Sequence, residues 1–325
     1  MIPGWIIWCW LLTAPWTLER STPPINTSYV LFGAILFFIG VFETYPILTS
    51  DILGFKWAFF MMGFAFFWIM QLHMSWPLLL PYLLLSFFFS VKKSVMAKSA
   101  LWFLFGAMFT GSFLAPTYLK YGFRNGLGGS DAVFVFNLQN LSRFINPAEG
   151  ILGWFLSLAS FEVPRFLGPH TAQRLSFLKM HPSIIPFAVF LWVIGILQPI
   201  AMFGLWFIQK TSNPDWKAVK YLILATLALL YLSFLFTNKT PQAHTIYFAL
   251  PLAMIYSFYC WSEFLTRRGW QLFAKLFLLS GIIFSATLAV HKFSQQSLYL
   301  DRTKVQSAIN LKDYRIMGER RSGAR

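Results

Sequence analysis

Long apolar runs separated by short polar segments dominate this chain. They occupy residues 28–48, 57–72, 76–91, 99–118, 184–208, 219–237, 244–262 and 271–290. A helix needs about 20 apolar residues to cross a bilayer, and a spanning backbone must satisfy its hydrogen bonds internally. The pattern therefore predicts an all-α integral membrane protein with about eight transmembrane helices.

Residues 119–183 form the only long interruption between apolar runs, and connections of that length usually carry function. The stretch VFNLQNLSRFINPAEGILGWFLSLASFEV has the pattern of interfacial amphipathic helices lying on the membrane. The residues expected on wet faces are Asn137, Gln139, Asn140 and Arg143, and those expected toward lipid are Phe134, Phe136, Leu138 and Leu141. The predicted divisions are transmembrane helices in 1–118, an outer loop in 119–183, transmembrane helices in 184–290 and a basic tail in 291–325.

Composition supports the membrane class. Of the 325 residues, 57% are hydrophobic and 11% charged, which leaves too little polar surface for a water-soluble globule. The net charge of +15 would suggest nucleic acid in a soluble protein, but here it indicates basic loops that face anionic headgroups or phosphorylated ligands. We therefore expect a bilayer and no nucleic acid as partners. Cys9 and Cys260 lie in apolar segments, so neither a disulfide framework nor a metal site is predicted.

Basic residues set the predicted orientation. The segment VKKSVMAK is placed in the cytoplasm because short cytoplasmic loops are rich in lysine and arginine. Alternation of spans then puts residues 119–183 outside, and it returns Lys210, Arg267 and Arg268 to the cytoplasm. The basic tail after Val290 falls outside, against the rule. Either one window is not a span, or the tail is a periplasmic extension.

The first 16 residues, MIPGWIIWCWLLTAPW, contain no basic residue and no small-residue cleavage site, so they make a poor signal peptide. They are also short for a span. Two interpretations stay open. The segment is a tryptophan-rich interfacial piece, or it is the end of a helix that begins further upstream.

His73 stands between two apolar runs in the stretch FWIMQLHMSWPLLLPYLLL. On the predicted topology, residues 57–91 form a helical hairpin whose turn reaches the outer interface. Gln71, His73 and Ser75 can meet water there. One interpretation is a wet turn whose polar residues satisfy the backbone. The other makes His73 a wall of an outward-facing active-site cavity.

Glu43, in VFETYP, is an acid deep within a predicted span, which makes it a candidate for function. Its predicted place near the cytoplasmic end favours a structural or interfacial role.

Two outer segments carry cations that could bind a phosphate. The first, LKYGFRNGLGGSDAVF, holds Arg124 beside glycines that match no nucleotide-binding fingerprint. The second, FTNKTPQAHTIYFALPL, holds Lys239 and His244 before Tyr247, so a lipid-linked phosphate could bind there while its tail lies along the helix. The simpler alternatives are solvated interfacial charges and a capped helix start.

The hairpin with QLHMSW and PLLLP, the extended outer loop and the late segment AHTIYFALPL together resemble the C-terminal half of bacterial GT-C glycosyltransferases. These are membrane enzymes similar to protein mannosyltransferases and aminoarabinose transferases. The resemblance spreads over residues 28–290 and implies transfer of a sugar from a polyprenyl-phosphate donor to an envelope acceptor, at the outer face of a bacterial inner membrane. It implies donor binding by His244 and Tyr247, and phosphate or acceptor binding by Arg124 and Arg143. Together with Lys239 and His73, which were singled out above from their surroundings in the sequence, they make six predicted substrate-binding residues.

The family's acidic catalytic pair has no counterpart in this sequence. The predicted first outer loop, TLERSTPPINT, offers only Glu19 beside Arg20. No catalytic residue, metal or cofactor is therefore carried over, and enzymatic activity stays undecided. The chain would be a divergent member, a fragment, or a partner of a catalytic half encoded upstream. The alternative is a non-enzymatic multi-pass membrane protein, such as a transporter, a flippase or an envelope-assembly subunit.

Overall fold

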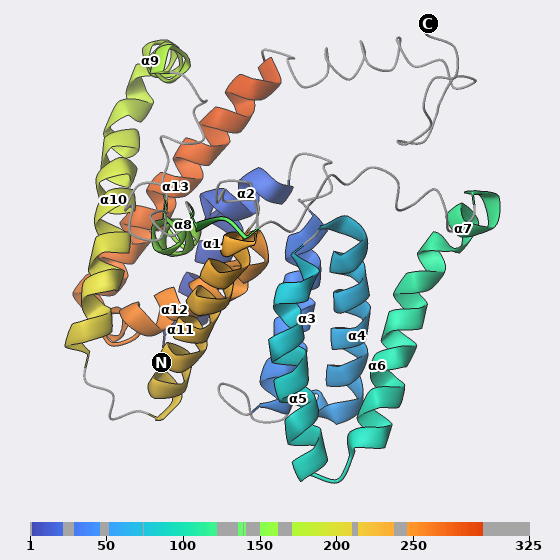
Figure 1. Cartoon of the computed structure of the whole chain (residues 1–325). Coiled ribbons are helices and arrows are strands. Elements are labelled where there is room, and N and C mark those ends of the chain that lie inside the picture. Colours follow the sequence, from blue (N-terminus) through green and yellow to red (C-terminus); the bar gives the residue numbers. More distant parts are fainter. Residues whose placement is uncertain are drawn as a thin grey trace, which may run out of the picture.

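The regular elements of this computed structural model are helices (Figure 1). The structure describes residues 2–21, 29–45, 52–73, 75–121, 136–138, 140, 150–161, 171–209, 214–236 and 246–294. The α-helices are α1 (Gly4–Thr13), α2 (Pro15–Ser21), α3 (Val30–Thr44), α4 (Gly54–Leu72), α5 (Leu80–Lys92), α6 (Met96–Gly111), α7 (Ala115–Tyr121), α8 (Ile151–Leu158), α9 (Thr171–Met180), α10 (Ile185–Ile208), α11 (Pro214–Leu235), α12 (Leu250–Trp261) and α13 (Arg268–Ser294). Short 3-10 turns are η2 (Trp76–Leu79), η3 (Ser112–Leu114), η6 (Pro182–Ile184), η8 (Tyr247–Ala249) and η9 (Phe264–Thr266).

Each of the eight predicted apolar windows overlaps a main apolar helix, but these helices differ in length. Five are long and apolar enough to cross a membrane: Gly54–Leu72, Met96–Leu114, Pro182–Ile208, Pro214–Leu235 and Arg268–His291. The other three windows hold the shorter apolar helices Val30–Thr44, Trp76–Lys92 and Tyr247–Trp261. The helical, multi-pass membrane class is thus supported, and five of the eight predicted spans have the required length.

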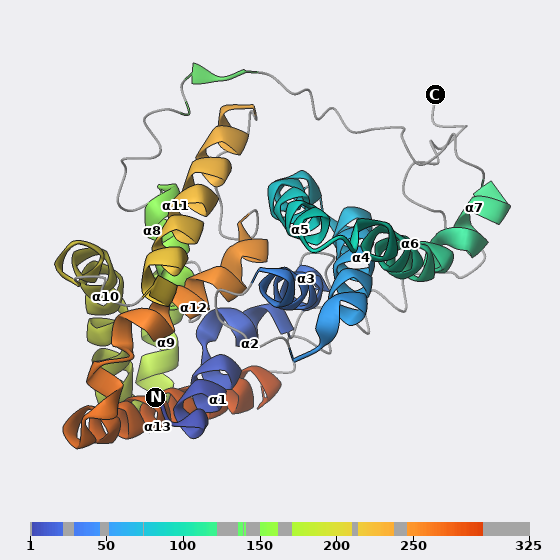
Figure 2. The same ribbon diagram turned by 90° about the horizontal axis from the view of Figure 1, so that it is seen from below.

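The helices α3, α4, α5 and α6 form one group, in which α4 lies between α3 and α6 (Figure 2). Glycines allow the close approach on both sides of α4. A Cβ atom placed on Gly106 of α6 would lie 2.1 Å from the carbonyl oxygen of Phe60 in α4. On the other side, a Cβ on Gly40 of α3 would lie 2.6 Å from the carbonyl oxygen of Ala58. Small residues of this kind let membrane helices pack backbone against backbone.

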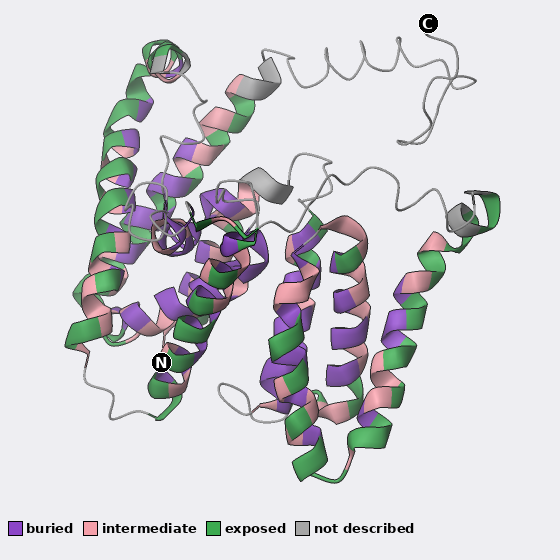
Figure 3. Ribbon diagram, viewed as in Figure 1, coloured by how far each residue is buried: buried purple, intermediate pink, exposed green. Residues whose placement is uncertain are grey.

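A second group contains α10, α11, α12 and α13, together with the short helices α1 and α8. It joins the first group where η8 and α12 pack against α3. A hydrogen bond of 2.6 Å between the hydroxyls of Tyr82 and Thr226 also links α5 to α11. Exposed apolar residues follow the outer sides of α6 and α10 (Figure 3). Such faces suit contact with lipid, because lipid is as apolar as the side chains that it covers.

Helix α8 departs from the predicted amphipathic helix on the membrane surface. Figure 1 shows it end-on between α10 and α12, and Phe155 and Leu158 are fully buried. It packs against α10, α11 and α12. The sequence ILGWFLSLAS is apolar on nearly every side, and a helix of that kind is stable when it is enclosed by other helices. Its eight residues measure about 12 Å, too short to cross a bilayer.

Glu43 takes a structural place in the first group. Its side chain is 5% exposed, and Oε2 accepts a hydrogen bond of 3.1 Å from the backbone N–H of Leu53. Leu53 is the residue that precedes α4. A carboxylate at this position satisfies one of the free N–H groups at a helix start and complements the helix dipole.

Candidate functional site

Four of the six predicted binding residues, Lys239, His244, Arg124 and Arg143, lie outside the described residues. The structure therefore places only Tyr247 and His73. It also describes the residues that flank the segments carrying the four cations. The contacts of these flanking residues define the candidate site.

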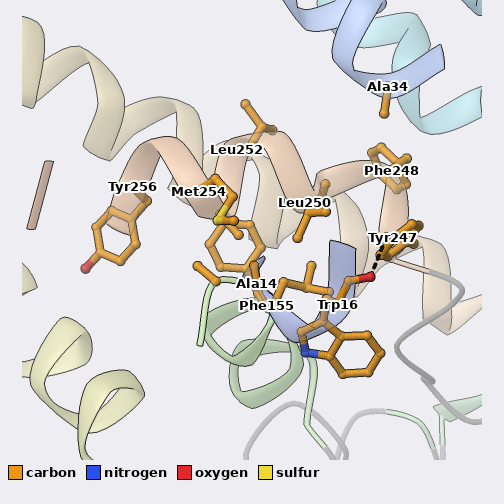
Figure 4. Packing of buried hydrophobic residues seen from close by; sticks show 14 of the residues in the cluster. Ala14, Trp16, Ala34, Phe155, Tyr247, Phe248, Leu250, Leu252, Met254 and Tyr256 are labelled. Carbon is orange, nitrogen blue, oxygen red and sulfur yellow. Dashed lines mark hydrogen bonds between the residues drawn. The ribbon is translucent and has the colours of Figure 1, made fainter. Parts of the chain in front are cut away.

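Tyr247 is a buried packing residue at the start of η8. It is 0% exposed, and its hydroxyl donates a hydrogen bond of 2.8 Å to the backbone carbonyl of Trp16 (Figure 4). The neighbouring side chains Phe248 and Leu250 belong to the same apolar cluster. A ligand could touch the Tyr247 ring only if this packing opened. The residue is therefore suited to fixing the end of the segment that carries Lys239 and His244.

Replacement of Tyr247 by phenylalanine should lower the free energy of unfolding by about 1 to 2 kcal/mol, because a buried hydrogen bond to the Trp16 carbonyl is lost. Thermal unfolding in detergent, followed by tryptophan fluorescence, measures the change. The control is Tyr221→Phe, since Tyr221 is exposed on α11. Equal stability of the two variants would show that the Tyr247 hydroxyl contributes nothing.

His73 ends α4 and shapes the turn of the predicted hairpin. Its Nδ1 atom accepts a hydrogen bond of 3.1 Å from the backbone N–H of Ser75, whose hydroxyl lies 2.9 Å from the same atom. Gln71 donates to the carbonyl of Thr110 in α6 at 3.2 Å. These polar side chains thus satisfy the backbone at a helix end, which is the first of the two interpretations given above. The half-buried imidazole still leaves part of its surface open.

Two hydrogen bonds tie Asn137 and Asn140 to the end of α11. The backbone N–H of Asn137 donates to the carbonyl of Leu235 at 2.7 Å, and Asn140 Nδ2 donates to the carbonyl of Phe234 at 2.6 Å. The wet face predicted for Asn140 is wrong, because this side chain is 2% exposed. The carbonyls at the end of a helix need donors, and the asparagine supplies one.

A buried polar cluster around Ala159 was not anticipated from the sequence. Its carbonyl accepts hydrogen bonds from Trp10 Nε1 at 3.3 Å and from Gln198 Nε2 at 3.1 Å. Gln198 is 4% exposed and stands before Pro199, and its Nε2 also lies 3.5 Å from the hydroxyl of Ser257. The Oε1 atom of Gln198 has no partner among the described residues. A glutamine followed by proline inside an apolar run was the one sequence feature that could have pointed to this place.

Within the described stretches, no three histidine, cysteine, aspartate or glutamate side chains gather closely enough to hold a metal ion. Cys9 and Cys260 are both free thiols.

Among known proteins, the chain matches no family model, no curated protein and no solved structure. The likeness to GT-C glycosyltransferases thus remains a prediction from short sequence motifs.

Proposed function

We propose that this chain is a membrane glycosyltransferase, or the donor-binding part of one, that takes a sugar from a polyprenyl-phosphate donor. The observation that carries the proposal is the pair of hydrogen bonds that hold Asn137 and Asn140 to the end of α11. One segment, with Arg143, follows Asn140, and the other, with Lys239, follows α11. The two are about a hundred residues apart in the sequence, and the hydrogen bonds hold their starting points together.

Chain length limits how far the cations can lie from that place. Arg143 follows Asn140 by three residues, and Lys239 follows Phe236 by three. Three residues reach at most about 11 Å. The ring centres of Phe136 and Phe236 lie 5.6 Å apart, which holds the two chain segments together. Lys239 and Arg143 can therefore act on the same phosphate, and His244 precedes the fixed Tyr247 by three residues.

The membrane arrangement that we propose has eight spans, three of them short, in a bacterial inner membrane. The turn between α5 and α6 and the start of α11 lie on one side of the helix assembly (Figure 1). Lys92, Lys93 and Lys217 belong to these ends, so this side is assigned to the cytoplasm. The end of α11 then faces outward, where a lipid-linked donor would present its phosphate at the interface.

A direct test measures donor binding by the full chain in lipid nanodiscs, with a polyprenyl-phosphate sugar as the probe. Lys239→Ala and His244→Ala should each weaken binding by roughly 1 to 3 kcal/mol, the range for hydrogen bonds to charged groups. The control is Arg320→Ala, which removes one positive charge from the tail. Repeating the titration at two salt concentrations separates a site from general attraction, because salt screens exposed charges.

Donor affinity that is equal in all three variants, and that falls with salt alone, would refute the proposed site. The segment AHTIYFALPL would then be only a capped helix start.

The alternative function, a transporter or flippase, is favoured by a different observation. The polar cluster of Gln198, Ser257 and the Ala159 carbonyl lies where α8 ends, and Gln198 is near the middle of the 24-residue α10. Helix ends and polar groups at membrane depth are typical of transport sites. Reconstituted vesicles distinguish a flippase from a glycosyltransferase, because a flippase moves labelled lipid from one leaflet to the other.

A further inference from the structure

Two histidines from remote parts of the chain contact each other at one end of the second helix group. His181 directly follows α9, and His291 lies in the last turn of α13. Their Nε2 and Nδ1 atoms, respectively, are 3.0 Å apart, and the two ring planes are nearly perpendicular, at 88°. The ring of Phe177 has its centre 5.1 Å from the centre of each imidazole. Both histidines are half-buried, so solvent reaches the pair.

We infer that His181 and His291 form a binding site for one divalent transition-metal ion of the copper or nickel type. Imidazole is the commonest protein ligand for such metals, and its neutral nitrogen suits copper, nickel and zinc. Sugar transfer as proposed above uses neither residue, so a negative result for one proposal leaves the other unaffected.

The spacing of the two nitrogens favours one coordination geometry. Histidine nitrogens lie about 2.0 to 2.1 Å from a bound metal. With 3.0 Å between the nitrogens, the angle at the metal would be about 90 to 97°. Neighbouring positions of a square-planar or octahedral ion make such an angle, as Cu²⁺ and Ni²⁺ prefer. A tetrahedral zinc ion would need a separation of about 3.4 Å.

Metal binding requires one proton to move. In the hydrogen-bonded pair, one imidazole holds a hydrogen on the shared N···N line and the other accepts it. A bound metal would lie to one side of the N···N line, and the proton of the donor ring would move to the second nitrogen of that ring, so that both rings stay neutral. Both rings would rotate so that the two nitrogen lone pairs point at the metal.

The residues near the histidine pair determine which further ligands a bound metal ion could have. The charged residues of α9 are Arg174 and Lys179, both cations, and η6 carries no charge. In the described part of the chain around the pair, the two imidazole nitrogens are thus the groups offered to a metal. Because one ligand follows α9 and the other belongs to α13, an occupied site would clamp α9 onto the end of α13.

The test uses the full chain in detergent, without a histidine tag, after removal of metals with a chelator. Titration with Cu²⁺, followed by electron paramagnetic resonance, should give one bound ion per chain, with hyperfine coupling to two imidazole nitrogens. His181→Gln and His291→Gln should each lower the affinity tenfold or more, at least as much as the loss of a supporting partner costs. His73→Gln is the matched control and should leave binding unchanged. Ni²⁺ should bind more tightly than Zn²⁺.

Circular dichroism checks that each variant is folded. The number of imidazole nitrogens coupled to Cu²⁺ is measured on the unaltered protein, so it holds even if a variant does not fold. If the unaltered chain binds no Cu²⁺, or if both glutamine variants retain its affinity, the pair is a hydrogen bond only and the proposed site is refuted.

Discussion

Gly106→Ala should strongly reduce the amount of folded protein, although it adds a single methyl group. The new Cβ would lie 2.1 Å from the carbonyl oxygen of Phe60 and 2.8 Å from the amide nitrogen of Phe64. Both are backbone atoms of α4, which cannot rotate aside as a side chain can. The two helices must separate, and we expect a loss of about 3 kcal/mol or more, at the upper end of the usual cost of overpacking.

Helix separation would also break the hydrogen bond from Thr110 Oγ1 to the carbonyl of Phe64, 3.0 Å long. Size-exclusion chromatography and thermal unfolding in detergent measure the outcome. Gly111→Ala is the control in the same helix, because nothing lies within 4 Å of a Cβ at that position. If both alanine variants were as stable as the unaltered chain, α4 and α6 would not pack at the distance described.

Lys220→Met should lower the free energy of unfolding by roughly 2 to 4 kcal/mol. The Nζ atom of Lys220 donates to the carbonyls of Trp206 at 2.6 Å and Gln209 at 3.2 Å, at the end of α10. It also lies 5.3 Å from the centre of the Trp216 ring. Hydrogen bonds from a charged donor, the helix dipole and the cation–π contact all favour the ammonium group in this place.

Methionine keeps the length and the apolar stem of the side chain, so the variant removes the charge and its hydrogen bonds with little change in packing. Lys217→Met is the control, because Lys217 is exposed on the same helix. The unfolding temperature should fall for Lys220→Met and stay nearly unchanged for Lys217→Met. A similar small effect in both would mean that Lys220 binds the α10 carbonyls too weakly to matter.

The hydrophobic pattern predicted where helices form, because each apolar run needs to be helical in lipid. It could not predict how long each helix is or where it lies. The stretch ILGWFLSLAS illustrates the difficulty: its polar flanks suggested a surface helix, whereas its apolar surface is enclosed by α10, α11 and α12. Asn140 was misplaced for the same reason, since only the packed structure brings its side chain to the carbonyl of Phe234.

That the six predicted residues form one binding site stays a prediction, because four of them lie outside the described residues. The partners of Tyr247 and His73 depend on contacts that no local sequence pattern contains. Tyr247 meets Trp16 across 231 positions in the sequence, and Gln198 meets Ala159 across 39. The His181–His291 contact spans 110 positions. Pairings at such distances are set by helix packing, which explains why the sequence pattern did not indicate them.

The bond between Tyr247 and Trp16 has a consequence for how the protein is made. A ribosome releases α1 and α2 before their partners in η8 and α13, which are synthesised more than 200 residues later. At a synthesis rate of about 5 to 20 residues per second, that delay lasts on the order of 10 seconds or more. During this time the tryptophans of α1 have no docking partner from the C-terminal helices. The headgroup region of the bilayer is where exposed tryptophan rings are most stable, so α1 would stay there until η8 and α13 have been synthesised.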